Sequence, residues 1–261
     1  MICAGGSGGK PLTGATTGSG GGGSGGVGRL LIPAQFLPDL VYIRVGQGGA
    51  ALTSGGANGS AGINSYVALQ PNTNNSSVLI TGGTLNAGNR VQSGGAAGLA
   101  PTFGNQALFG ISSAVAGAAG GAGGNSGAAG ASVTYASSTG LVCLTGGGGS
   151  AGYDGVSANN GGSVANTNSY PFVTLPGVGA NTTSANGYGA GRRIDPNNPQ
   201  ELGLLFFTGS PGGGASASAG VTGGSSGAVG YGCGSGAGGG GSAACGNVAA
   251  GGDGLVLISA W

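Results

Sequence analysis

The sequence has little of what most enzymes and nucleic-acid-binding proteins require. It contains no histidine, one tryptophan, and only 6 basic and 5 acidic residues among 261, for a formal net charge of +1. This charge is too small for nucleic-acid binding through phosphate neutralisation or for a polybasic attraction to membranes. The longest apolar runs, such as residues 204–207, are much shorter than a membrane span. We therefore expect no nucleic-acid partner and no membrane insertion.

Catalytic chemistry is excluded nearly as broadly. Residues 5–9 and 22–26 match the G-x-S-x-G pattern of hydrolases, but without histidine no Ser-His-Asp triad can form. Lys10 follows a glycine, yet Pro11 stands where a P-loop needs Ser or Thr. The carboxylates lie in separate turn-like contexts, whereas a glycosidase needs a convergent pair. We expect no enzyme activity, no catalytic residue and no cofactor.

Cysteine is scarce and lacks the spacing of metal ligands. The four residues are Cys3, Cys143, Cys233 and Cys245. No histidine is available to complete a metal site, so we expect no bound metal. Pairing of Cys233 with Cys245 is the favoured disulfide in an oxidising environment. Four small buried thiols are the simpler interpretation.

Glycine is what the sequence has in excess. There are 70 glycines, and in several stretches they recur at every third position. A period of three is that of the extended polyproline II helix, and chains without side chains can approach closely. Their buried N–H and C=O groups can then bond from chain to chain. The clearest rows are 121, 124, 127 and 130; 146, 149, 152 and 155; and 224, 227, 230, 236 and 239.

Two other interpretations of this composition are weaker. Collagen needs glycine at every third residue throughout and abundant proline, whereas here there are 10 prolines and the register breaks repeatedly. Disorder is favoured by the Gly, Ser and Asn content, but disordered chains usually carry high net charge and lack recurring apolar runs. We therefore expect an ordered chain.

Strand-like runs alternate with the glycine tracts. Residues 29–45, 65–81 and 132–145 each predict two short strands around a turn, with weaker runs at 170–176 and 202–208 and a last one at 254–261. No helical periodicity appears, and glycines argue against a helix at 107–119. The sequence predicts a mainly β fold in which short antiparallel hairpins alternate with polyglycine II segments in one bundle or sandwich. We expect a single domain over 1–261: a glycine-rich segment at 1–28, three hairpin units over 29–145, and a glycine-rich bundle over 146–261.

This succession of hairpins and glycine tracts resembles the glycine-rich tail-fibre and adhesin proteins of tailed bacteriophages. The segments that carry the resemblance are residues 32–46, 205–214 and 251–261. The resemblance implies a virion surface appendage of polyglycine II type that assembles as an oligomer with other fibre proteins. In such adhesins, variable loops on the glycine scaffold bind the host. The absence of a signal-peptide pattern in the first thirty residues agrees with assembly in a virus particle released by lysis.

Two functions remain open. In the first, polar loops at 71–77, 158–169 and 180–198 bind a host surface glycan or outer-membrane protein, because loops on rigid scaffolds usually carry recognition. In the second, the chain is a purely structural fibre, collar or decoration subunit, and the loops are ordinary turns. Ice binding by a flat glycine face is a weaker third possibility. The candidate receptor contacts are Asn74, Asn75, Tyr170, Tyr188, Arg192 and Arg193.

Overall fold

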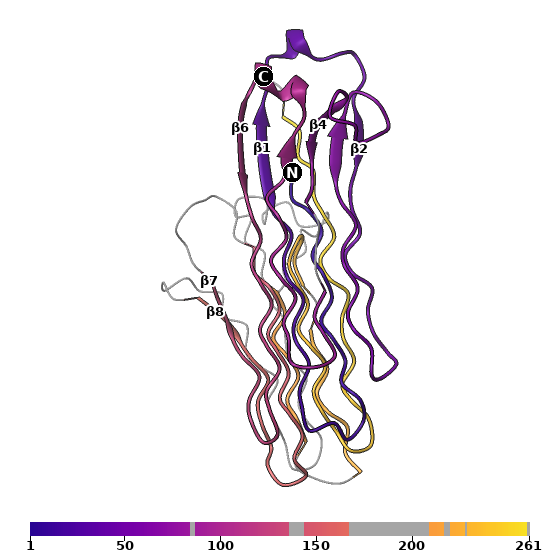
Figure 1. Ribbon diagram of the computed structural model, residues 1–261, viewed down its shortest axis with the longest axis vertical. Coiled ribbons are helices and arrows are strands. Elements are labelled where there is room, and N and C mark those ends of the chain that lie inside the picture. The colour runs from indigo at the N-terminus through magenta and orange to yellow at the C-terminus, as the bar shows by residue number, and fades with distance from the viewer. Residues whose placement is uncertain (84–86, 136–143, 167–208, 217–219, 228, 260–261) are drawn as a thin grey trace.

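Long extended segments run side by side along the molecule, and most of the regular secondary structure lies towards one end (Figure 1). The computed structural model describes residues 1–83, 87–135, 144–166, 209–216, 220–227 and 229–259. The elements in these ranges are β1 Val27–Leu31, η1 Ala34–Phe36, β2 Tyr42–Arg44, β3 Tyr66–Ala68, β4 Val78–Thr81, β5 Thr102–Phe103, η2 Asn105–Phe109, β6 Ile111–Val115, β7 Val133–Tyr135 and β8 Val164–Asn166. Both η elements are short 3-10 helices, and the described residues contain no α-helix. The predicted mainly β fold is therefore confirmed.

The strands form three small sheets. β1 pairs with β6, and β2, β3, β4 and β5 form a four-stranded sheet in that order; every pairing in both sheets is antiparallel. The predicted hairpin at 65–81 is confirmed by the β3–β4 pair. β7 and β8 form a third sheet and run parallel. The rest of the hairpin predicted at 132–145 falls mostly on residues 136–143, outside the described residues, so that hairpin stays a prediction.

The hairpin predicted at 29–45 is wrong in its pairing, although both of its strands exist. Residues 32–41 pass through η1, which follows Pro33 and precedes Pro38, and they cross the end of the bundle (Figure 1). Proline lacks the N–H that a strand ladder requires, so this connection cannot tighten into a two-residue hairpin turn. β1 and β2 consequently belong to different sheets.

The glycine-rich segments are joined by backbone hydrogen bonds with a period of three. Within residues 147–152, residues i and i+3 donate their N–H groups to the same neighbouring segment. The three such pairs bond to three different segments. The bonds are Gly147 to Gly22 and Ser150 to Ser19; Gly148 to Ser210 and Ala151 to Gly213; Gly149 to Ala131 and Gly152 to Ala128. A chain with three residues per turn points successive N–H groups in three directions, which is the arrangement expected of packed polyglycine II chains.

The same pattern links distant parts of the sequence. Cys3, Gly6 and Gly9 donate to Gly26, Gly23 and Gly20, so the first two glycine-rich segments run antiparallel. Residues 235 and 238 donate to residues 6 and 9, which places the C-terminal segment beside the N-terminal one. These bonds satisfy backbone groups that burial removes from water.

The glycine rows are not uninterrupted helices, because each of the three contains a chain reversal. Gly127, Gly155 and Gly232 have φ values of +67°, +79° and +69°, a conformation that favours glycine. The turn at 125–128 is closed by a hydrogen bond from the Ala128 N–H to the Asn125 carbonyl. The turn at 154–157 is closed by the Asp154 side chain. The period of three thus continues in the sequence through turns where the chain changes direction.

Apolar side chains form only a small core. Ile2, Leu144, Val229 and Cys233 make a buried cluster, against which Tyr231 and other half-buried residues pack. Cys3, Cys233 and Cys245 are buried thiols, which agrees with the simpler interpretation for these three; Cys143 lies outside the described residues. Burial raises the pKa of the Cys3 thiol to about 11.

The buried Cys3 thiol predicts a loss of stability at alkaline pH. Its pKa rises from 9.0 to about 11 on folding, so above pH 9 the unfolded chain loses a proton that the folded protein retains. Stability therefore falls as the pH rises from 9 to 11, by about 2 to 3 kcal/mol for this group. The measurement is urea unfolding across this range for the wild type and Cys3→Ala. Lys10 and Cys245 are present in both proteins, so the difference in unfolding free energy between the wild type and Cys3→Ala isolates Cys3. If this difference does not change with pH, the prediction is contradicted.

Candidate functional site

Two of the predicted contact residues lie in an ordered loop at the strand-rich end of the bundle. Asn74 and Asn75 belong to the β3–β4 connection, and both are exposed. The Asn72 side chain accepts a hydrogen bond from the Asn74 N–H at 3.0 Å, and the Asn75 carbonyl accepts one from Asn105 N–H at 3.0 Å. Backbone contacts to η2 thus hold this loop while it presents two amide side chains to solvent.

The other predicted contacts cannot be placed. Tyr170, Tyr188, Arg192 and Arg193 lie outside the described residues, as does the whole of 180–198. Of the loop 158–169, only residues 158–166 are described, and they include β8.

Several polar turns, which sequence reasoning missed, lie in the half of the bundle away from the strand-rich end (Figure 1). We call the turns at 90–93, 125–128 and 153–157 the polar turn cluster. The side chains of Gln92 and Asn125 are hydrogen-bonded. A carboxylate oxygen of Asp154 lies beside Gly127, 2.7 Å from where a Cβ on that residue would stand. The cluster was missed because the candidate loops were chosen for runs rich in Asn, Thr and Ser. The available signal was a short polar pair inside an otherwise regular glycine row, such as Asn125-Ser126.

Asp154 gives the polar turn cluster a fixed negative charge. One of its carboxylate oxygens accepts hydrogen bonds from the Ser157 N–H at 2.7 Å and the Val156 N–H at 2.9 Å. These bonds lower the pKa of the Asp154 carboxyl because they favour its ionised form. The cluster therefore presents a carboxylate beside amide side chains on backbone that hydrogen bonds hold in place.

Besides the polar β3–β4 loop, the strand-rich end exposes several large apolar side chains. The rings of Phe36 in η1 and Phe109 in η2 stack with their centroids 5.1 Å apart, and both remain about half exposed. Leu108 and Ile111 are 83% and 76% exposed. Apolar side chains concentrated in this way are typical of surfaces that contact another protein. Exposed apolar side chains are thus more numerous among the described residues of the strand-rich end than in the polar turn cluster, where Val156 is strongly exposed.

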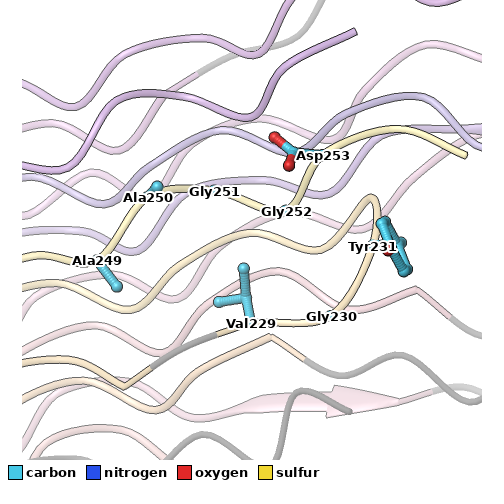
Figure 2. A pocket seen from close by; sticks show the side chains of 8 residues that line it. All are labelled: Val229, Gly230, Tyr231, Ala249, Ala250, Gly251, Gly252 and Asp253. Atoms are coloured by element: carbon cyan, nitrogen blue, oxygen red, sulfur yellow. The ribbon is translucent and has the colours of Figure 1, made fainter. Parts of the chain in front are cut away.

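A groove lies between two C-terminal segments, part-way along the bundle. Residues 229–231 and 249–253 line it, and its volume is about 310 Å³ (Figure 2). Tyr231 is half-buried and Asp253 is exposed, while glycine and alanine make up most of the rest. Sequence reasoning missed this groove as well, because its two segments are separated in the chain and neither differs in composition from the other glycine-rich segments.

Lys10 is buried and hydrogen-bonded within the bundle. It is only 4% exposed, and its ammonium group donates hydrogen bonds to the Thr53 carbonyl at 2.6 Å and to Asn247 Oδ1 at 2.8 Å. Burial lowers the pKa of this amine. The group thus joins three distant segments.

No cluster of three or more potential metal ligands occurs in the part of the chain that the structure describes. Within the same residues, no helix is long and apolar enough to cross a membrane.

Comparison with known proteins adds no assignment. No protein-family model matches the chain, and no curated protein matches it significantly.

Proposed function

We propose that the protein is an adhesin subunit of a virion surface appendage, such as a phage tail fibre, which binds a host surface glycan or outer-membrane protein. The observation that carries the proposal is the three-way hydrogen bonding of the glycine-rich segments. Each segment is tied to several neighbours, so the bundle is a stiff support from which short chain reversals project. Rigid supports that display short polar turns are suited to recognition.

The distribution of exposed side chains supports this role. The exposed apolar residues of the strand-rich end, including Phe36 and Leu108, suit attachment to other fibre proteins. The polar turn cluster, with Asn125 and Asp154, suits contact with hydroxyl and amide groups. The low overall charge limits nonspecific capture by charged envelopes. The alternative is a structural fibre, collar or decoration subunit with no recognition role.

The test is binding of fluorescently labelled protein to a panel of bacterial strains. An adhesin is expected to label a subset of the strains. In a turn variant, Gln92, Asn125 and Ser126 are replaced by glycine; this removes the polar side chains and leaves the turn backbone intact. We expect this variant to unfold at nearly the same temperature as the wild type and to lose most of its labelling.

Two further loop variants and one control locate the contact; with the turn variant they make three loop variants. Glycine substitution of Asn74 and Asn75 tests the β3–β4 loop, and a Gly/Ser loop of equal length tests residues 180–198. Leu108→Ser at the strand-rich end is the control and should leave cell labelling unchanged. Labelling of no strain by the wild type, or unchanged labelling by all three loop variants, favours the structural alternative.

A further inference from the structure

The groove between residues 229–231 and 249–253 is built on rigid backbone. The Gly232 N–H donates to the Asp253 carbonyl at 2.7 Å, and the Gly252 N–H donates to the Cys233 carbonyl at 2.8 Å. Gly232 itself has a φ of +69°, which turns the chain at the end of the groove. The two walls are therefore fixed to each other before any ligand arrives, which lowers the entropic cost of binding.

The groove exists because small residues line it. Gly230, Gly251 and Gly252 are buried and lack side chains, so the backbone itself forms much of the surface. A Cβ at Gly252 would overlap the Gly230 carbonyl, which shows how closely the walls approach at the base. The volume of about 310 Å³ lies at the lower end of the range for small-molecule sites and fits one or two sugar rings.

Two side chains give the groove its chemical character. Tyr231 and Asp253 come from the two different segments, and both belong to the lining of the groove (Figure 2). One carboxylate oxygen of Asp253 accepts the Gly48 N–H at 2.8 Å, which orients the exposed group. Tyr231 packs partly against the buried core cluster, so its ring is held as well. The lining thus includes one aromatic ring and one oriented acceptor.

We infer that this groove binds a neutral pyranose unit of a surface polysaccharide; the biological meaning of this site, as host glycan recognition, rests on the proposed adhesin function. The C–H face of a pyranose stacks on an aromatic ring, and its hydroxyls donate to a carboxylate. The carboxylate disfavours anionic ligands because like charges repel. A single carboxylate among the eight lining residues does not make a metal site.

The experiment is an NMR titration of the ¹⁵N-labelled full chain with glucose, galactose, N-acetylglucosamine and rhamnose, each added separately. Binding of one of these sugars should shift the amide signals of Gly230, Gly232 and Gly252, with an affinity in the millimolar range. Tyr231→Leu retains apolar packing without the ring, and Asp253→Asn retains an acceptor for Gly48 without the charge. Each is expected to weaken binding about tenfold.

Two variants serve as matched controls. Tyr231→Phe keeps the ring and should bind as the wild type does. Tyr153→Leu changes a half-buried tyrosine in the polar turn cluster and should leave the sugar affinity unchanged. If no sugar shifts the groove signals, or if Tyr153→Leu weakens binding as much as Tyr231→Leu, the assignment is wrong.

The outcome separates this inference from the proposed function. Strain labelling that persists in Tyr231→Leu, together with no sugar binding, overturns the groove assignment and leaves the adhesin role standing. Sugar binding in the groove by a protein that labels no strain supports the saccharide site and contradicts the adhesin role.

Discussion

Gly149→Ala is expected to destabilise the protein by about 3 kcal/mol or more, although it adds one methyl group. A Cβ at this position would overlap the Ala122 carbonyl and lie 2.9 Å from the Gly123 nitrogen, so every close atom belongs to backbone. Backbone atoms cannot rotate away as a side-chain end can. The neighbouring segment must therefore shift, and its hydrogen bonds to the rest of the bundle shift with it.

Gly55→Ala is the matched control. A Cβ there would meet only the Pro11 carbonyl, at an ordinary contact distance of 3.6 Å. Alanine also restricts the unfolded chain more than glycine does, so this variant should be neutral or more stable by up to about 1 kcal/mol. Gly124→Ala, whose Cβ would overlap the Ala128 carbonyl, should behave like Gly149→Ala. Urea unfolding of the three variants gives the comparison, and equal small effects would mean that the glycine rows are not closely packed.

The mainly β class and the β3–β4 hairpin were predictable from local pattern. Residues 66–68 and 78–81 are β-prone runs on either side of an Asn-rich turn, and the short connection favours their pairing. The three-residue period of the glycines directly reflects the three directions in which an extended chain offers its N–H groups. Both signals are local, so the fold class followed from them.

Which segments are neighbours was not predictable in the same way. β1 pairs with β6, some eighty residues later in the chain, and glycine rows resemble one another too closely for pattern alone to specify partners. The structure indicates that buried serines add specificity, since their hydroxyls bond only to particular backbone groups. Examples are Ser19, whose hydroxyl donates to the Gly9 carbonyl at 2.8 Å, and Ser24, whose oxygen accepts the Ala118 N–H at 2.7 Å. Sequence reasoning treated serine as turn or loop composition and missed this use.

The candidate site was predicted less well than the fold. Their Asn, Thr and Ser content, with the Tyr and Arg residues that they hold, led to the loops at 71–77, 158–169 and 180–198, whereas the bundle also presents turns of only a few residues. Such turns carry a weak composition signal because they interrupt a glycine row by two or three residues. The groove at Tyr231 and Asp253 depends on two segments being adjacent, which local sequence does not specify.

Ser235→Ala is expected to cost about 2 to 4 kcal/mol, because two buried backbone groups lose their partner at once. Ser235 is fully buried; its hydroxyl donates to the Ala249 carbonyl at 2.7 Å and its oxygen accepts the Gly8 N–H at 3.0 Å. Alanine fits the space but offers neither a donor nor an acceptor. Urea unfolding measures the loss, and Ser54→Ala at an exposed position is the control, with an expected change within about 0.5 kcal/mol.

Hydrogen exchange distinguishes a lost bond from general loosening of the bundle. In Ser235→Ala the Gly8 amide should exchange faster than the Gly6 and Gly9 amides, whose bonds go to the Gly23 and Gly20 carbonyls and do not involve the hydroxyl. Equal acceleration at all three amides would mean that the serine acts through packing. Exchange that stays slow at Gly8 would mean that the Ser235 hydroxyl is dispensable and that backbone contacts alone determine how these segments pair.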